Sequence, residues 1–142
     1  PLDVKNFTLE ELIPHRGTML LLGEVVAGDC THAITLSRVS STWPMADADG
    51  VSPLICVELA AQTAGVCNGL ERIEKSGIDS DQMGWLVAVK RADFFIEHLL
   101  LGMSITTRAD NSLAFDKFRE VTSQLHHGDT LLAEVVLQLY QV

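Results

Sequence analysis

The sequence has few basic side chains. Its 142 residues include ten Lys and Arg against nineteen Asp and Glu, which gives a formal net charge of −9. A surface that follows a nucleic-acid backbone needs clustered Lys and Arg to neutralise phosphates. The shortage of positive charge therefore argues against nucleic acid as a partner.

Cysteines are also few. Cys56 and Cys67 lie in one apolar segment, eleven residues apart, which places them about 16 Å from each other if that segment is helical. That separation is far beyond the reach of a disulfide, and Cys30 falls in a predicted turn with no obvious partner. Reduced thiols, together with the absence of a signal peptide, predict a cytoplasmic protein.

The sequence lacks several common binding motifs. No group of His, Cys and carboxylate residues has the spacing of a metal site, and no Gly-rich phosphate loop is present. We therefore predict neither a metal ion nor a cofactor. The longest apolar segment is interrupted by Glu58, Gln62 and Asn68, so it is too short and too polar to span a membrane. With no repeat and no linker, residues 1–142 fit a single domain with a full hydrophobic core.

The apolar segment from Ser52 to Leu70 predicts a helix over residues 53–75. Pro53 suits the first helical position and Ser52 the N-cap before it. The helix is apolar on almost every face, which indicates that it is buried all round. Glu58 stands inside this segment, where a carboxylate costs several kcal/mol unless it is hydrogen-bonded or has a raised pKa.

Glu58, Gln62, Gly65 and Gly69 share one stripe of this helix, because they follow the i, i+4, i+7, i+11 spacing. Two hydrogen-bonding groups followed by two residues without side chains favour a narrow channel over a packed seam. The alternative is purely structural: a satisfied Glu–Gln pair that holds the helix to a sheet.

The rest of the sequence predicts one short helix and a set of strands. A capping box at residues 8–11 begins a helix over residues 8–13. Period-two segments predict strands over residues 19–26, 32–39, 85–96, 103–109, 113–125 and 130–140, with turns at 28–29, 110–112 and 127–129. Long strands joined by short turns form an antiparallel sheet. The predicted fold class is α+β, with a curved antiparallel sheet wrapped around one long buried helix.

Motifs around this helix carry a resemblance. Residues 12–26 begin Leu-Ile-Pro-His-Arg, residues 42–44 read Thr-Trp-Pro, and residues 57–62 read Val-Glu-Leu-Ala-Ala-Gln. Shorter matches follow at residues 89–92, 117–119 and 133–135. In this order they resemble the hotdog-fold 3-hydroxyacyl-ACP dehydratases from about residue 9 onward. The resemblance is strongest to a dehydratase-like branch associated with aryl-polyene lipid gene clusters, and it implies a hotdog fold.

The resemblance also implies which residues carry the chemistry. In the family, a His of a His-Phe-Pro motif and a carboxylate on the central helix share the acid and base roles, often from opposite subunits. Glu58 matches that carboxylate, and an apolar tunnel is expected to raise its pKa. Thr42 stands at the position of the family's His, and a hydroxyl group cannot act as a general base near neutral pH. His15 is therefore the other candidate catalytic residue; the alternative, which the Pro-His-Arg sequence favours, is a structural role at the tight entry into the first strand.

Further residues are predicted to bind the acyl substrate and its carrier. The predicted substrate-binding residues are Gln62, Thr42, Trp43, Pro44 and Gly65. The net negative charge means that any contact with an acidic carrier protein must be local. Lys90 and Arg91 are predicted to make it, with Arg16, Arg72 or Lys75 as additional candidates.

Three functions remain open from the sequence. The first is dehydration of a 3-hydroxyacyl thioester carried on ACP or CoA, in a tunnel at the interface of a homodimer formed by pairing of edge strands. The second is a hotdog acyl thioesterase that uses Glu58 alone. The third is a non-catalytic acyl-binding subunit that keeps the tunnel but has lost the family's His.

Overall fold

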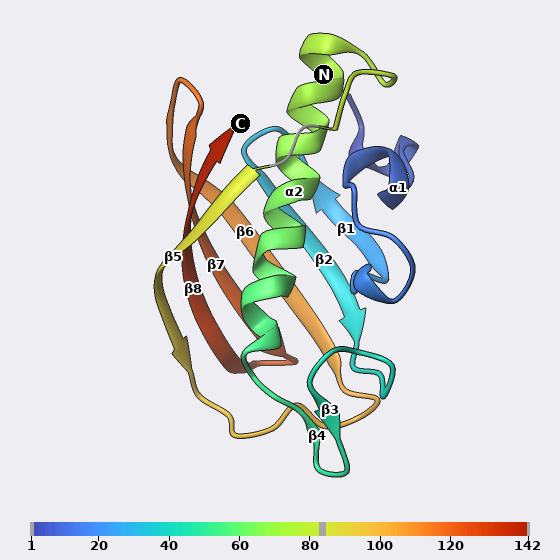
Figure 1. Cartoon of the computed structure of the whole chain (residues 1–142), viewed down its shortest axis with the longest axis vertical. Coiled ribbons are helices and arrows are strands. Elements are labelled where there is room, and N and C mark those ends of the chain that lie inside the picture. Colours follow the sequence, from blue (N-terminus) through green and yellow to red (C-terminus); the bar gives the residue numbers. More distant parts are fainter. Residues whose placement is uncertain (1, 83–84, 142) are drawn as a thin grey trace.

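The computed structural model describes residues 2–82 and 85–141 and shows one long helix enclosed by one curved antiparallel sheet (Figure 1). The helix, α2, spans Ile55–Ser76. The sheet has six strands in the order β1-β2-β6-β7-β8-β5. Their bounds are β1 Glu24–Gly28, β2 His32–Arg38, β5 Trp85–Phe94, β6 Ser104–Phe115, β7 Phe118–His127 and β8 Thr130–Gln141. The predicted α+β architecture is confirmed.

The N-terminal segment covers the side of α2 that the sheet leaves open near β1. Its short helix α1 spans Leu9–Leu12, and the predicted capping box is present: Thr8 accepts from the backbone of Glu11, and the Glu11 side chain accepts from the backbone N–H of Thr8. A two-stranded hairpin, β3 Ala46–Asp47 and β4 Gly50–Val51, lies near the N-terminal end of α2 (Figure 1).

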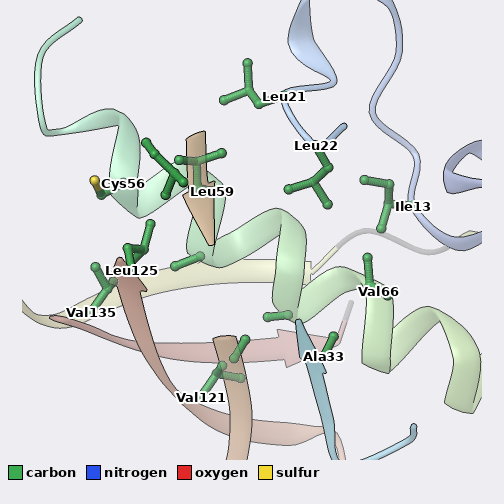
Figure 2. Close-up of a cluster of buried hydrophobic side chains, with 14 of the residues drawn as sticks. Ile13, Leu21, Leu22, Ala33, Cys56, Leu59, Val66, Val121, Leu125 and Val135 are labelled. Carbon is green, nitrogen blue, oxygen red and sulfur yellow. The ribbon is translucent and has the colours of Figure 1, made fainter. Parts of the chain in front are cut away.

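The hydrophobic core lies between α2, the concave face of the sheet and the N-terminal segment. In Figure 2, Leu125 and Val135 of the sheet and Ile13 and Leu22 of the N-terminal segment lie on opposite sides of α2. Leu59, Val66 and Leu70 on the helix are almost completely buried. Burial of large apolar side chains contributes roughly 1.5–3 kcal/mol each, so this helix is held by packing.

The helix begins two residues later than predicted. Pro53 and Ser52 form a turn that precedes α2, in which the N–H of Ile55 donates to the backbone oxygen of Ser52 at 3.1 Å. The Ser52 side chain still accepts a hydrogen bond from the N–H of Leu54 at 3.3 Å, so it stabilises the turn that leads into the helix. Burial is also less complete than predicted, because one stripe that includes Val57 and Ala61 stays partly exposed.

The strand boundaries depart most from the predictions around residues 110–117 and before β1. The turn predicted at residues 110–112 is wrong: β6 continues through it to Phe115 with a bulge between Asn111 and Leu113, and the hairpin turns at residues 116–117. Asp-Asn-Ser resembles a turn in sequence, but here a bulge accommodates it within a paired strand. The strand predicted over residues 19–26 begins only at Glu24, because residues 17–19 form a 3-10 turn.

No helix of residues 2–82 and 85–141 is both long and apolar enough to cross a membrane. Cys30, Cys56 and Cys67 are free thiols, and burial raises the pKa of Cys56 to about 12.

Candidate active site

A groove of about 620 Å³ runs along the partly exposed stripe of α2. One wall comes from the N-terminal segment with Pro14 and His15, and the other from β5 with Trp85 and Val87. The floor is α2 itself, from Val57 to Ser76, and the far end is closed by the β6–β7 hairpin. The groove therefore begins within the first turn of the helix and follows it for several turns.

Glu58 and His15 meet at the first end of this groove. Nε2 of His15 lies 3.4 Å from Oε1 of Glu58, and the two side chains are 29% and 38% exposed. They come from segments 43 residues apart in the sequence. Two proton-transfer groups are thus in contact with each other and reachable from the groove.

Gln62 holds the Glu58 carboxylate in place from inside the protein. Its Nε2 donates to Oε1 of Glu58 at 3.0 Å and to the backbone oxygen of Met19 at 2.8 Å. Its Oε1 accepts from the N–H of Leu21 at 3.0 Å. Gln62 is completely buried and does not line the groove, so its predicted role in binding substrate is not supported by its position. Gln62 therefore ties Glu58 to the backbone of Met19 and Leu21, shortly before β1.

The pKa of Glu58 is lowered, and the sequence-based expectation of a raised pKa is wrong. The contact with His15 is the largest cause, burial opposes it, and the hydrogen bond from Gln62 lowers the pKa further. A carboxylate in the first turn of a helix is also favoured by the helix dipole. Glu58 is therefore ionised over the neutral pH range, with both contacts on Oε1 and no partner for Oε2 among the described residues.

Gly65 and Gly69 both serve a packed seam and border the groove, so the predicted channel and a seam meet at these residues. A Cβ added to Gly69 would lie 2.1 Å from the backbone oxygen of Leu12, and one added to Gly65 would lie 3.0 Å from Cγ2 of Ile13. Both glycines still border the groove with their backbone. Their absent side chains let residues 12–13 approach α2, and the following residues bring His15 to Glu58.

The Thr-Trp-Pro segment lies elsewhere in this chain. Thr42 is exposed and hydrogen-bonded to the Ser40 side chain at 2.9 Å, and Trp43 is buried in the core. Neither residue lines the groove, and nor does Pro44. The position that carries His in the resembled family is therefore separate from Glu58 within one chain.

The two residues first predicted to contact a carrier, Lys90 and Arg91, already bind carboxylates. Lys90 pairs with Glu120 at 3.1 Å and Arg91 with Asp93 at 2.6 Å, and neither borders the groove. Arg72 and Lys75 do border it at its far end. Lys75 there pairs with Glu71.

Sequence reasoning did not identify Glu71 and Arg119 at this far end. Arg119 is 8% exposed, pairs with Glu71 at 2.8 Å and lies 6.0 Å from the centre of the Trp85 ring. Arg119 belongs to a short motif that supported the resemblance, but nothing in its spacing indicated that it would reach α2. No cluster of three or more His, Cys, Asp and Glu suited to a metal ion occurs in the described parts of the chain.

Comparisons with known proteins agree with this architecture. The sequence model of the ApeP-like family, described as ApeP dehydratase, matches residues 7–142. No curated protein sequence matches the chain at a significant level.

Among solved structures, the dehydratase heterocomplex ApeI:P from Xenorhabdus doucetiae is similar, with a TM-score of 0.81 at 21% identity over 96% of this chain and 91% of that chain. A hypothetical thioesterase with coenzyme A from Streptococcus pneumoniae TIGR4 is also similar, with a TM-score of 0.63 at 7% identity over 84% of both chains. The PaaI protein of Escherichia coli has a TM-score of 0.58 at 12% identity over 82% of this chain and 81% of that chain. At these identities the structures support the fold alone. The family match over almost the whole sequence, joined to a long helix wrapped by an antiparallel sheet, shows that the chain is a hotdog-fold protein of the ApeP-like dehydratase family.

Proposed function

We propose that this chain dehydrates 3-hydroxyacyl thioesters, with Glu58 and His15 as its acid–base pair. The observation that carries the proposal is the 3.4 Å contact between His15 Nε2 and Glu58 Oε1 at the end of an open groove. A general acid and a general base must both be within reach of the substrate, and geometry comes before pKa. His15 supplies the second group that Thr42 cannot.

The lowered pKa of Glu58 favours its role as the base. Oε2 of its carboxylate takes the proton from C2 of the substrate, and the electron pair forms the C2–C3 double bond. The C3–O bond breaks, and the hydroxyl group takes a proton from Nε2 of the His15 imidazolium and leaves as water. The products are a 2-enoyl thioester and water, with Glu58 protonated and His15 neutral. Net transfer of one proton from the Glu58 carboxyl group to Nε2 of His15 restores the starting state.

The two nitrogens of His15 differ in a way that supports this assignment. Nδ1 is buried and has no hydrogen-bond partner within the described residues, whereas Nε2 faces Glu58. Only Nε2 is therefore placed to exchange a proton with a ligand in the groove.

The open side of the groove supports assembly with a second hotdog chain. β5 is an edge strand of ten residues, with Leu86, Val87 and Val89 each about half exposed or more. A long apolar edge with unpaired backbone groups is stable in solution when another strand pairs with it. We propose a homodimer through β5 that covers the groove. The similar structure from Xenorhabdus doucetiae is a heterocomplex, so a different hotdog subunit is the alternative occupant of this edge.

Parallel assays on one substrate test the proposed activity. The purified chain is incubated with 3-hydroxyacyl-ACP and 3-hydroxyacyl-CoA, and both the 2-enoyl thioester and the released thiol are measured. Formation of the enoyl thioester without thiol release supports dehydration. Thiol release would instead identify a thioesterase. If neither product forms with the chain alone or with a second hotdog subunit, and Thr42→His creates dehydration, the natural protein is an acyl-binding subunit.

A further inference from the structure

The segment that presents His15 is held to the protein in two different ways. Upstream, α1 is anchored by side chains of other segments: Arg72 donates to the backbone oxygen of Glu11 at 2.8 Å, and Gln82 donates to that of Glu10 at 2.9 Å. At Pro14 and His15 the described residues provide no such anchor from another segment. Pro14 has no N–H, and the N–H of His15 makes no backbone hydrogen bond among the described residues.

The side chain of Arg16 bridges this gap. Its Nη1 donates to the backbone oxygens of Ile13 at 2.6 Å and His15 at 2.8 Å, and its Nη2 donates to the backbone oxygen of Glu10 at 2.8 Å. One guanidinium therefore ties the end of α1 to the peptide groups on both sides of Pro14. Such a planar fork with several fixed donors can satisfy three carbonyls at once, which the compact ammonium of a lysine cannot do in the same geometry.

We propose that Arg16 is a positioning residue, which sets the distance between His15 and Glu58 by fixing the backbone of residues 13–15. This inference rests on the proposed function only for its kinetic consequence, because the contact itself exists whether or not the chain turns over substrate. Arg16 is exposed and does not border the groove, so it touches no ligand there.

Rigid placement matters because a displacement of about 1 Å in a catalytic group can lower a rate by about a hundredfold. We therefore expect Arg16→Ala to lower kcat by roughly ten- to a hundredfold with little change in KM. Arg16→Lys should fall between Arg16→Ala and the natural protein, since one or two of the three carbonyls keep a donor. Arg108→Ala is the matched control: Arg108 is also exposed and bonded within its own segment, to Asp110, and it does not border the groove.

The experiment has one arm that needs no turnover. The titration of the Glu58 carboxyl is followed by carbon-13 NMR in the natural chain, His15→Ala, Arg16→Ala and Arg108→Ala. Because the contact with His15 is the main cause of the lowered pKa of Glu58, His15→Ala should raise that pKa. Arg16→Ala should raise it in the same direction, and Arg108→Ala should leave it unchanged. A raised pKa in His15→Ala with none in Arg16→Ala would overturn the positioning role and leave the proposed function standing.

The kinetic arm is a double-mutant cycle. If Arg16 acts through His15, Arg16→Ala should have no further effect on kcat in a His15→Ala background. Equal losses in both backgrounds would show that Arg16 acts on general stability instead. If the NMR shifts appear as expected but no variant dehydrates any thioester, the positioning role is supported and the proposed function fails. If His15→Ala leaves the Glu58 pKa unchanged, His15 does not contact Glu58 in solution and both proposals fail.

Discussion

The two flanks of α2 differ in whether residues of this chain cover them. On the flank toward the N-terminal segment, this chain supplies its own partners: Gly69 meets the backbone of Leu12, and all hydrogen-bonding groups of the Gln62 amide are used. On the flank toward β5, Val57 and Val87 border an open groove, and the outer edge of β5 has no neighbouring strand among the described residues.

This difference separates two functions of the fold. Contacts within one chain place Glu58 beside His15, because residues 12–13 pack against Gly65 and Gly69 on the closed flank. In the proposed function, the open flank encloses the substrate once a second chain covers its apolar residues. Mutations on the first flank should therefore alter chemistry and stability, and those on the second should alter assembly.

The largest effect is expected from Glu58→Gln. Loss of the carboxylate removes the base, so dehydration should fall to background, while the shape of the side chain is kept. The free energy of unfolding should change by no more than about 2 kcal/mol. Glu74→Gln, on an exposed face of the same helix, is the control and should keep full activity. Full turnover by Glu58→Gln would make Glu58 a structural residue only.

His15→Ala should come next, with a loss of about 10²- to 10⁴-fold in kcat, the usual contribution of a positioned acid or base. His98→Ala and His127→Ala should be close to the natural protein, because both side chains are exposed and neither lines the groove. Rates of enoyl thioester formation give the comparison. Similar losses in all three variants would show that His15 takes no part in the chemical step.

Val87→Lys tests the open flank. A lysine there adds a charge to an apolar surface that we expect to be covered, so self-association should weaken by about a hundredfold or more. Leu113→Lys is the control, since Leu113 is exposed but lies on β6, away from the β5 edge. Analytical ultracentrifugation over a range of concentrations measures both. If the natural chain stays monomeric at micromolar concentration, a second copy of the chain does not cover this flank.

Gly69→Ala should destabilise the closed flank by about 1–3 kcal/mol, because its Cβ would meet backbone that cannot move aside easily. Gly65→Ala is the matched comparison: its Cβ meets only the Ile13 side chain, and the gain in helix propensity of about 1 kcal/mol offsets much of that contact. Urea unfolding measures both free energies. Equal stability of the two variants would show that the seam at Leu12 is looser than the structure indicates.

The smallest effect concerns pH. The pKa of Glu58 is lower in the folded chain than its ordinary value, so the ionised carboxylate adds stability above the ordinary pKa. That contribution is lost as the pH falls through the lowered folded pKa. Urea midpoints measured from about pH 6 to about pH 3 should therefore fall slightly less in Glu58→Gln than in the natural chain. An identical slope would mean that His15 does not stabilise the Glu58 carboxylate.

Local patterns predicted the elements that depend on neighbouring residues. The apolar segment predicted α2 to within two residues at its start, and the i, i+4 spacing predicted the contact of Glu58 with Gln62. The capping box at Thr8 also formed as predicted. The turn at residues 110–112 was wrong because pairing between β6 and β7 outweighs local turn preference, and the strand takes up the extra residue as a bulge.

The sequence by itself thus determined the long helix, the antiparallel strands, the family and the carboxylate on the helix, because these follow from short-range spacing and ordered motifs. Only the tertiary structure decided that His15 reaches Glu58 across 43 positions, and that Thr42 does not line the same groove. It also decided the direction of the Glu58 pKa, since a hydrogen-bonded partner outweighs the cost of burial. The physical reason is that which side chains meet depends on contacts between distant segments, such as the close approach of Leu12 to Gly69, which no local pattern encodes.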